Sequence, residues 1–148
     1  MIGIGRKMAH EAAGDTRTLI LDAAEGLFAE RGYDGVPLRD ITGRAAVKLS
    51  LARYHFKTKD ALFEAVVARR IEMLGSLRQA ALRDVVADGH PSVEAVLHAF
   101  AGPFLVLMLD GGTGWRQFGR LVAQLALGDR HQALTRRYLD ETTRIFVA

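Results

Sequence analysis

Apolar residues recur at helical intervals near the start of the chain. Within residues 16–31 they stand one, four, five, eight and nine positions after the first of them, which places them along one stripe of a helix. The glycine that follows, Gly32, readily adopts the left-handed conformation that ends many helices. The pattern therefore predicts an amphipathic first helix whose buried stripe consists of Leu19, Ile20, Ala23, Ala24, Leu27 and Phe28.

Two short helices are predicted next, over residues 37–45 and 49–56, with a tight turn between them. Pro37 suits the first helical position, because the N–H that proline lacks would be unpaired there in any residue. Helices this short are marginal in isolation, so neighbouring helices must hold them in place. Thr58 is expected to cap a long fourth helix that runs to about residue 86.

The second half of the chain carries three further helical patterns. Residues 93–109 are apolar on nearly every side, which predicts a buried fifth helix, kinked where Pro103 interrupts it. The uncharged run inside that helix is shorter than the roughly 20 residues that span a bilayer. A sixth helix is predicted over residues 115–127 and a seventh from about residue 129. Its apolar pattern is still running at Ala148, so we expect that the chain is truncated there or that another chain covers this end.

Positive charge is concentrated in residues 36–60. This stretch has six basic and two acidic residues, a net charge of +4, whereas the whole chain carries +3, so the remaining residues sum to −1. Such a concentration suits a polyanionic partner. Lys59 also falls in the first turn of a helix, where the macrodipole favours acidic residues, and a bound phosphate would remove that conflict.

The sequence offers few residues for catalysis, metal binding or disulfide bonds. The absence of cysteine excludes disulfides and thiolate zinc sites and fits a reducing compartment. Histidines are scattered, and the GGTG at 111–114 lacks the Lys-Ser/Thr pair of a phosphate-binding loop. We therefore expect no enzyme, no metal and no cofactor. Residues 1–14 lack the apolar core of a secretory signal and are expected to form a flexible arm.

Four stretches together carry a family resemblance. They are the helix TRTLILDAAEGLFAERGYDG, the segment LRDIT, the turn AAV and the stretch RYHFKTKDALFEAVV. With this spacing, residues 17–70 resemble the TetR (tetracycline-repressor-like) family of bacterial transcriptional regulators. The resemblance implies an all-α fold with a three-helix helix-turn-helix DNA-binding domain at residues 15–75. A long fourth helix would join it to a helical effector-binding and dimerisation domain at residues 76–148, which would be incomplete.

The resemblance also implies which residues touch DNA. Arg39 matches a position that can reach a base edge, and arginine to guanine is the commonest specific contact. Residues 48–50 and Arg53 match the exposed face of the recognition helix, and Lys59 matches a lysine that contacts the DNA backbone. The full set expected at the DNA is Thr16, Arg17, Arg39, Thr42, Lys48, Leu49, Ser50, Arg53, Tyr54, His55, Lys57 and Lys59.

Several positions depart from the family pattern. Pro37 replaces the usual Ser or Thr cap of the second helix, and Ala46 stands where Gly is common in the turn. Lys48 stands where Ser or Asn usually caps the recognition helix, and Arg53 stands where Tyr is frequent. The last two changes add positive charge, so we expect an operator of different sequence rather than a loss of DNA binding.

For function, the resemblance implies a cytoplasmic, ligand-responsive regulator, most simply a repressor. It would bind a near-palindromic operator as a homodimer, with recognition helices about 34 Å apart. A small apolar effector in the second domain would be reciprocally coupled to DNA affinity. The residues that could line its cavity are His98, Phe100, Phe104, Met108, Trp115 and Phe118.

Each of these assignments has a plainer alternative. The basic stretch could be a solvated helical surface, Tyr54 a core aromatic and His55 a packed or capping histidine. The six cavity residues could be ordinary core, and His98 a hydrogen-bonded core residue. Two other classes of function also stay open: a small-molecule-binding protein or enzyme that uses the C-terminal helical cavity, and a basic amphipathic protein that binds membranes.

Overall fold

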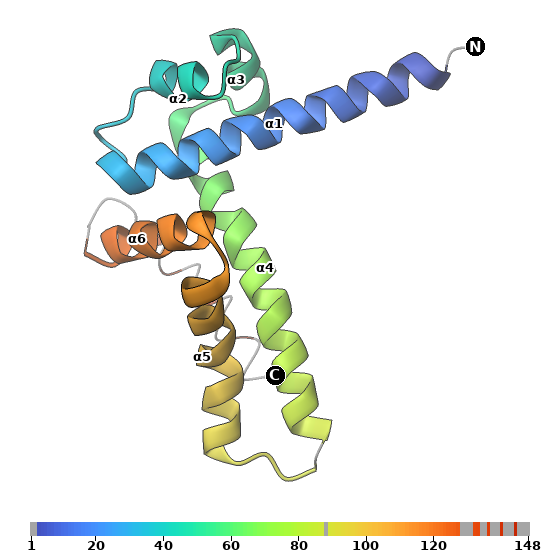
Figure 1. Cartoon of the computed structure of the whole chain (residues 1–148), viewed down its shortest axis with the longest axis vertical. Helices are drawn as coiled ribbons and strands as arrows, with labels where there is room; N and C mark the ends of the chain where they lie inside the picture. The colour runs from blue at the N-terminus through green and yellow to red at the C-terminus, as the bar shows by residue number, and fades with distance from the viewer. Residues whose placement is uncertain are drawn as a thin grey trace. The chain divides into compact units, whose positions relative to one another are not determined.

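The computed structural model describes the backbone of residues 3–87 and 89–127 and five single residues beyond them, 132, 133, 136, 140 and 144; side chains are described from residue 15 onward and, in the last helix, to residue 125. The all-α prediction is confirmed in this part of the chain, which contains helices and no strand (Figure 1). The predicted seventh helix lies almost entirely outside the described residues. The helices are α1 (Gly3–Arg31), α2 (Leu38–Arg44), α3 (Leu49–His55), α4 (Lys59–Ala87), α5 (Val93–Asp110) and α6 (Thr113–Leu127).

The first helix is longer than predicted. We expected it to begin near Thr16 after a flexible arm, but α1 begins at Gly3, so the arm prediction was wrong about the secondary structure of residues 3–14. Most residues there are good helix formers, and the glycines cost only about 1 kcal/mol each. The predicted end is confirmed, because Gly32 has a φ of 72° and its N–H donates to the carbonyl of Phe28 at 2.9 Å.

The chain divides into two compact units, Met1–Val66 and Val67–Ala148. The boundary lies within α4, earlier in the chain than the predicted boundary after residue 75. The first unit therefore contains α1, α2, α3 and the opening turns of α4, and the second contains the rest of α4 with α5 and α6.

The core of the first unit forms where α1 packs against α2, α3 and the start of α4. Phe28 is fully buried, with the ring of Phe63 set edge-on at 5.1 Å and that of Tyr33 stacked at 5.8 Å. The predicted stripe on α1 is correct except at Leu19, which is 46% exposed, whereas Leu21 is buried. The buried apolar residues of this unit are Ile20, Leu21, Ala23, Ala24, Leu27, Phe28, Ala29, Val36, Ile41, Ala52, Phe56, Leu62, Phe63 and Val66.

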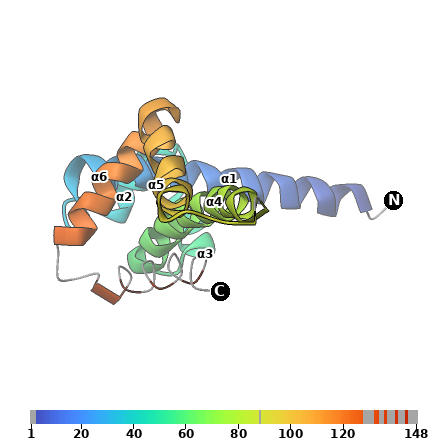
Figure 2. The ribbon, with the colours of Figure 1, turned by 90° about the horizontal axis from the view of Figure 1, so that it is seen from below.

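The core of the second unit forms where α6 runs across the end of α5 (Figures 1 and 2). The turn between them needs Gly111, because a Cβ there would stand 2.4 Å from the carbonyl oxygen of Leu107 and 2.6 Å from the Trp115 ring. Met108 packs against Gly119, where a Cβ would stand 2.5 Å from the Met108 sulfur. The buried apolar residues are Val67, Leu74, Ala99, Trp115, Phe118 and Leu121.

The fifth helix is much more exposed than predicted. We expected α5 to be buried because it is apolar nearly all round, but only Ala99 is buried on it. The side chains left in solvent are Val93, Leu97, Phe100, Leu105, Val106 and Leu109. By length and composition alone α5 could cross a membrane. This is weak evidence, because core helices of soluble proteins meet the same two criteria. Ser92 caps the helix by accepting a hydrogen bond from the Ala95 N–H at 3.1 Å, and Pro103 lies inside α5.

Candidate nucleic-acid interface

The turn between α2 and α3 is closed by backbone hydrogen bonds. The N–H of Ala45 donates to the Ile41 carbonyl at 2.9 Å, and the N–H of Val47 donates to the Thr42 carbonyl at 3.0 Å. Ala46, between them, has a φ of 54°. A residue with a Cβ is strained in this left-handed conformation, which explains why glycine would suit the position. The turn sets the direction in which α3 leaves α2.

The second helix begins one residue later than predicted. Pro37 is the extended residue before α2, with φ −73° and ψ 151°, and it supplies no side-chain cap. The helix is held instead by ion pairs to α1. Arg44 donates two hydrogen bonds of 2.9 Å to Glu30, and these lower the pKa of Glu30 and raise that of Arg44. Arg31 donates to Asp40 at 3.1 Å.

Arg39 is the most exposed cation described on α2. Its side chain is 84% exposed, and the nearest carboxylate, Asp40, lies 3.7 Å from its Nε while also binding Arg31. Arg31 and Arg44 therefore fasten α2 to α1, and Arg39 projects into solvent from the same short helix.

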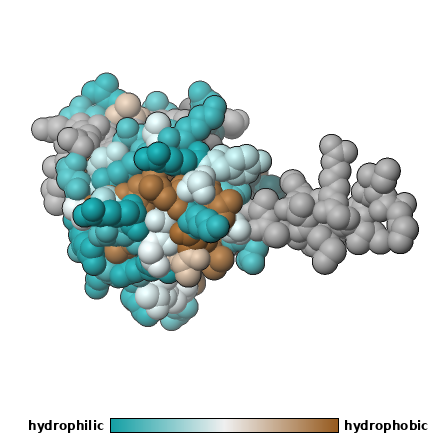
Figure 3. Space-filling model, turned by 90° about the horizontal axis from the view of Figure 1, so that it is seen from above, coloured by the Kyte–Doolittle hydropathy of each residue, from teal (hydrophilic) through white to brown (hydrophobic). Residues whose placement is uncertain are grey.

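The third helix buries one side and exposes the other. Ala52 and Phe56 are buried against the first unit, whereas Ser50, Arg53 and Tyr54 are exposed. Tyr54 is 78% exposed, with its ring set edge-on to His55 at 5.2 Å, so it is not a core aromatic. Figure 3 views this unit from the α2 and α3 side and shows a brown apolar area bordered by teal hydrophilic surface.

The start of α4 holds Lys59 in a defined place. Thr58 caps the helix as predicted, since its hydroxyl accepts a hydrogen bond from the Ala61 N–H at 3.0 Å. The Lys59 ammonium lies over the Tyr33 ring, 4.1 Å from its centroid, and the Tyr33 hydroxyl donates to the Asp60 carboxylate. Asp60 supplies an acidic residue in the first turn, so the conflict with the helix macrodipole is smaller than Lys59 alone suggested.

Arg17 brings α1 to the same surface. Its guanidinium lies 5.2 Å from the centroid of the Phe56 ring, directly after the end of α3. Thr16 is partly buried beside it. The first unit therefore exposes cations on α1, α2 and α3, and it holds Lys59 partly buried at the start of α4.

The structure separates the twelve predicted contact residues by exposure. Thr42 is buried, and its hydroxyl donates to the Arg39 carbonyl at 3.0 Å, so it does not belong to the exposed surface. Thr16, His55 and Lys59 are partly buried. The exposed members are Arg17, Arg39, Lys48, Leu49, Ser50, Arg53, Tyr54 and Lys57. Within the described residues no ion pair joins Lys48, Arg53 or Lys57 to a carboxylate.

Two residues at this surface were missed from the sequence. Only the fold places the ring of Tyr33 beneath Lys59. Leu51 was not singled out, although it is 40% exposed on α3. Tyr33 lies in the family-like stretch that ends GYDG, but the resemblance gave it no role, whereas the exposed position of Leu51 could have been inferred from the buried positions of Ala52 and Phe56.

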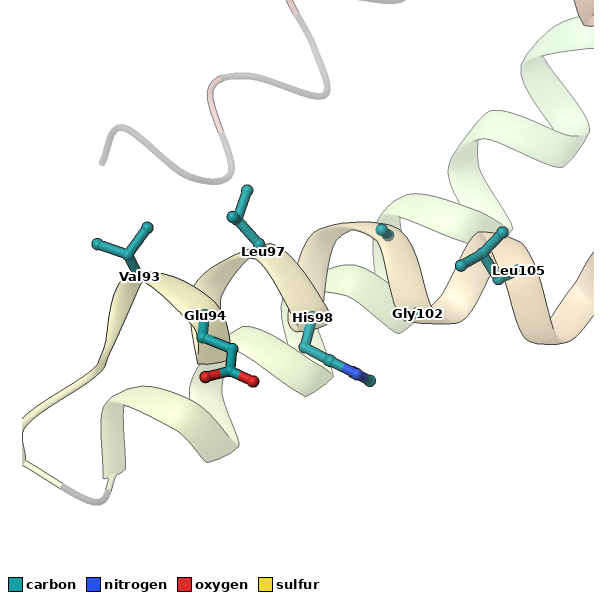
Figure 4. Close-up of a pocket in the computed structure, with 7 residues that line it drawn as sticks. Val93, Glu94, Leu97, His98, Gly102 and Leu105 are labelled. Atoms are coloured by element: carbon teal, nitrogen blue, oxygen red, sulfur yellow. The ribbon is translucent and has the colours of Figure 1, made fainter.

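An apolar groove of about 460 Å³ lies along α5 in the second unit (Figure 4). Figure 4 shows Val93 and Leu97 pointing to one side of the helix and Glu94 and His98 to the other. Of the six residues predicted to line an effector cavity, only His98 lies on this groove. The residues that line it are Val93, Glu94, Leu97, His98, Ala101, Gly102 and Leu105.

The other five predicted cavity residues lie elsewhere in the second unit. Phe100 lies under Arg78, whose guanidinium is 4.2 Å from the ring centroid and whose Nε donates to the Phe100 carbonyl at 2.8 Å. Trp115 and Phe118 are buried edge-on to each other at 5.7 Å. Phe104 and Met108 are partly buried. Among the side chains described, no group of three His, Asp or Glu residues could hold a metal ion.

Comparison with known proteins identifies two family models along the chain. One, described as bacterial regulatory proteins of the tetR family, matches residues 20–66, and the other, the tetracyclin repressor-like C-terminal domain, matches residues 98–148. A crystal structure of a TetR-family transcriptional regulator from Mesorhizobium loti MAFF303099 aligns with a TM-score of 0.62 over 87% of this chain and 61% of that one. At 21% identity it supports the fold alone.

Two curated relatives match the front of the chain. The HTH-type transcriptional activator FasR of Mycolicibacterium smegmatis is 33% identical over 86 residues, which is 58% of this chain and 39% of FasR. The negative transcriptional regulator IcaR of the biofilm operon icaADBC in Staphylococcus aureus is 36% identical over 58 residues, which is 39% of this chain and 31% of IcaR. The chain thus spans between about a third and two fifths of the length of these relatives.

Proposed function

Because the chain belongs to the TetR family of bacterial regulatory proteins, we propose that it is a DNA-binding transcriptional regulator. The observation that carries the proposal is the exposed side of α3 and its two flanks. Arg53 on the helix, Lys48 just before it and Lys57 just after it have no carboxylate partner among the described residues. In the absence of DNA, these neighbouring cations have no favourable electrostatic interaction with one another. Against a duplex each can neutralise a phosphate and release a counterion.

The geometry suits insertion of α3 into the major groove. A helix with its side chains fits the groove, which is about 12 Å wide. Ser50, Arg53 and Tyr54 would then face base edges or the groove walls, and Arg39 on α2 would reach a base or phosphate nearby. Lys59, Arg17 and Lys57 would flank the groove as phosphate contacts. Thr42 has no such role, because it is buried.

We assign the two predicted domains accordingly. Residues 15–75 would bind DNA, and residues 76–148 would bind an effector and form part of a homodimer. The α5 groove supports this assignment, since it is apolar and lies outside the DNA-binding unit. A small apolar effector bound there would favour one arrangement of the dimer, and its affinity and that for DNA would then be coupled reciprocally. Repression in the cytoplasm, by occupying a near-palindromic operator, is the simplest form of this function.

The experiment that tests the proposal is selection of bound sequences from random duplex DNA. We expect enrichment of two inverted half-sites whose centres lie about one helical turn, 10–10.5 base pairs, or a multiple of it apart. A single enriched half-site would support DNA binding and contradict the dimer. Equal recovery of all sequences would contradict a sequence-specific regulator.

A second candidate is a small-molecule-binding protein or enzyme that uses the second unit, which the α5 groove favours. The two functions differ in coupling. If an apolar ligand binds with the same affinity in the presence and absence of operator DNA, or is turned over, this second candidate is favoured over a ligand-responsive regulator.

A further inference from the structure

Two leucines on α3 remain in solvent beside a well-filled core. Leu49 is 38% exposed and Leu51 is 40% exposed. The side of α3 that faces the first unit is already occupied by Ala52 and Phe56, both buried. An exposed leucine is common on protein surfaces and indicates nothing by itself. The surroundings of Leu49 are what make it informative.

Leu49 lies among cations that have no carboxylate partner in the described part of the chain. Lys48 and Ser50 flank it in the sequence, and Arg53 is four residues further on. At 3.6 residues per turn, Arg53 lies about 40° around the helix from Leu49 but about 160° from Leu51. A polyanion drawn to Arg53 and Lys48 would therefore cover Leu49.

We propose that Leu49 reads a thymine in each operator half-site by packing against its C5-methyl group. This inference rests on the proposed function, since it requires α3 to lie in the major groove. The thymine methyl is the apolar group that base pairs present there, and apolar side chains recognise it by contact. Leu49 cannot donate or accept a hydrogen bond, so burial of this methyl is the discrimination it can provide.

The same chemistry predicts what Leu49 does not read. A cytosine or an adenine offers an amino group at the corresponding edge, and guanine offers two acceptors. If the Leu49 side chain covered one of these polar groups, the group would lose its hydrogen bond to water and gain no other, which is unfavourable. Leu49 would therefore select thymine by attraction and disfavour the other bases by desolvation.

The test replaces single thymines with deoxyuridine in the operator found by selection, which removes the methyl group and nothing else. Binding is measured by fluorescence anisotropy with the full chain. For the unaltered protein we expect one thymine per half-site whose replacement weakens binding about fourfold, the effect of about 0.8 kcal/mol for one buried methyl. At that thymine, Leu49→Ala should bind both duplexes equally.

Leu77→Ala is the matched control, because it removes the same atoms from a similarly exposed position, 41% against 38%, in the second unit. It should keep the full fourfold methyl effect. Leu49→Met, which stays apolar, should keep most of it, and circular dichroism should show unchanged helicity in all three variants. This guards against a variant that loses binding by failing to fold.

Three outcomes would overturn the inference: no methyl-sensitive thymine in the unaltered protein, a methyl effect that survives in Leu49→Ala, or a methyl effect lost equally in Leu77→Ala. In each of these the protein still binds its operator, so the proposed function stands. If no duplex sequence is enriched in the selection, the proposed function fails and the inference fails with it.

Discussion

Replacing Lys59 with alanine should remove one phosphate contact while leaving sequence preference unchanged. The ammonium is held 4.1 Å above the Tyr33 ring, and Tyr33 is in turn fixed by its hydrogen bond to Asp60 and its stacking on Phe28. Lys59 is therefore placed before DNA arrives, at the capped start of α4. A phosphate bound there interacts with the ammonium and with the positive end of the α4 macrodipole.

The magnitude follows from counterion release. Each neutralised phosphate contributes about 0.9 to the slope of log K against log salt, so the slope of Lys59→Ala should be shallower by about that amount. Between roughly 50 mM and 200 mM salt, this makes the deficit of the variant shrink by about 3.5-fold. The deficit itself should be similar for operator and random DNA, because a phosphate contact carries no sequence information.

The assay is a titration of labelled duplex at four or more salt concentrations. Arg44→Gln is a matched control, since it also removes one positive charge from the same unit. The Arg44 charge is already neutralised by two hydrogen bonds to Glu30, so its slope should equal that of the unaltered protein. Equal slopes for Lys59→Ala and the unaltered protein, or a deficit confined to the operator, would refute the reasoning.

Two further predictions concern the stability of the first unit. Ala46→Gly should raise the free energy of unfolding by about 0.5–1 kcal/mol. Glycine removes the strain that alanine has at a φ of 54°, and this gain exceeds the cost of the greater conformational entropy of glycine in the unfolded chain. Urea denaturation with an unchanged m-value would measure this, and a loss of stability would contradict it. The Arg44 hydrogen bonds lower the pKa of Glu30 in the folded state, so the pair stabilises the protein above the ordinary glutamate pKa, about 4.3, and this contribution is lost as pH falls through the lower folded value. The unaltered protein should therefore be more stable than Arg44→Gln at neutral pH, and this difference should disappear in acid. A difference that persists unchanged in acid would contradict a stabilising Glu30–Arg44 pair.

The helix-turn-helix could be predicted from sequence because its determinants are local. Gly32 ends α1, Thr58 caps α4, and the spacing of Ala52 and Phe56 marks the buried side of α3. Each of these acts within one turn of helix. Local signals of this kind are visible in the sequence without knowledge of any distant partner.

The errors fall where burial depends on distant partners. Leu19 and Leu21 both fit a stripe on α1, and only the positions of the neighbouring helices decide that Leu21 is buried. Thr42 was placed on the exposed side of α2, but its hydroxyl bonds within the helix and the residue is covered.

The second unit was the least predictable. Apolar residues on every side of α5 predicted burial, yet composition does not specify what packs against a helix, and most of α5 is exposed. The cavity prediction chose four large aromatic residues together with His98 and Met108. Trp115 and Phe118 are buried, the groove is lined by other residues along one helix, and only His98 belongs to both sets.

The central claim is that the exposed side of α3 binds duplex DNA, and Arg53→Glu tests it most directly. Arg53 is exposed and has no carboxylate partner among the described residues, so reversing its charge should leave the fold intact by circular dichroism. We predict that the affinity for the selected operator falls at least about tenfold at moderate salt, since a base or phosphate contact is replaced by repulsion. An Arg53→Glu protein that binds the operator as tightly as the unaltered chain would contradict the account.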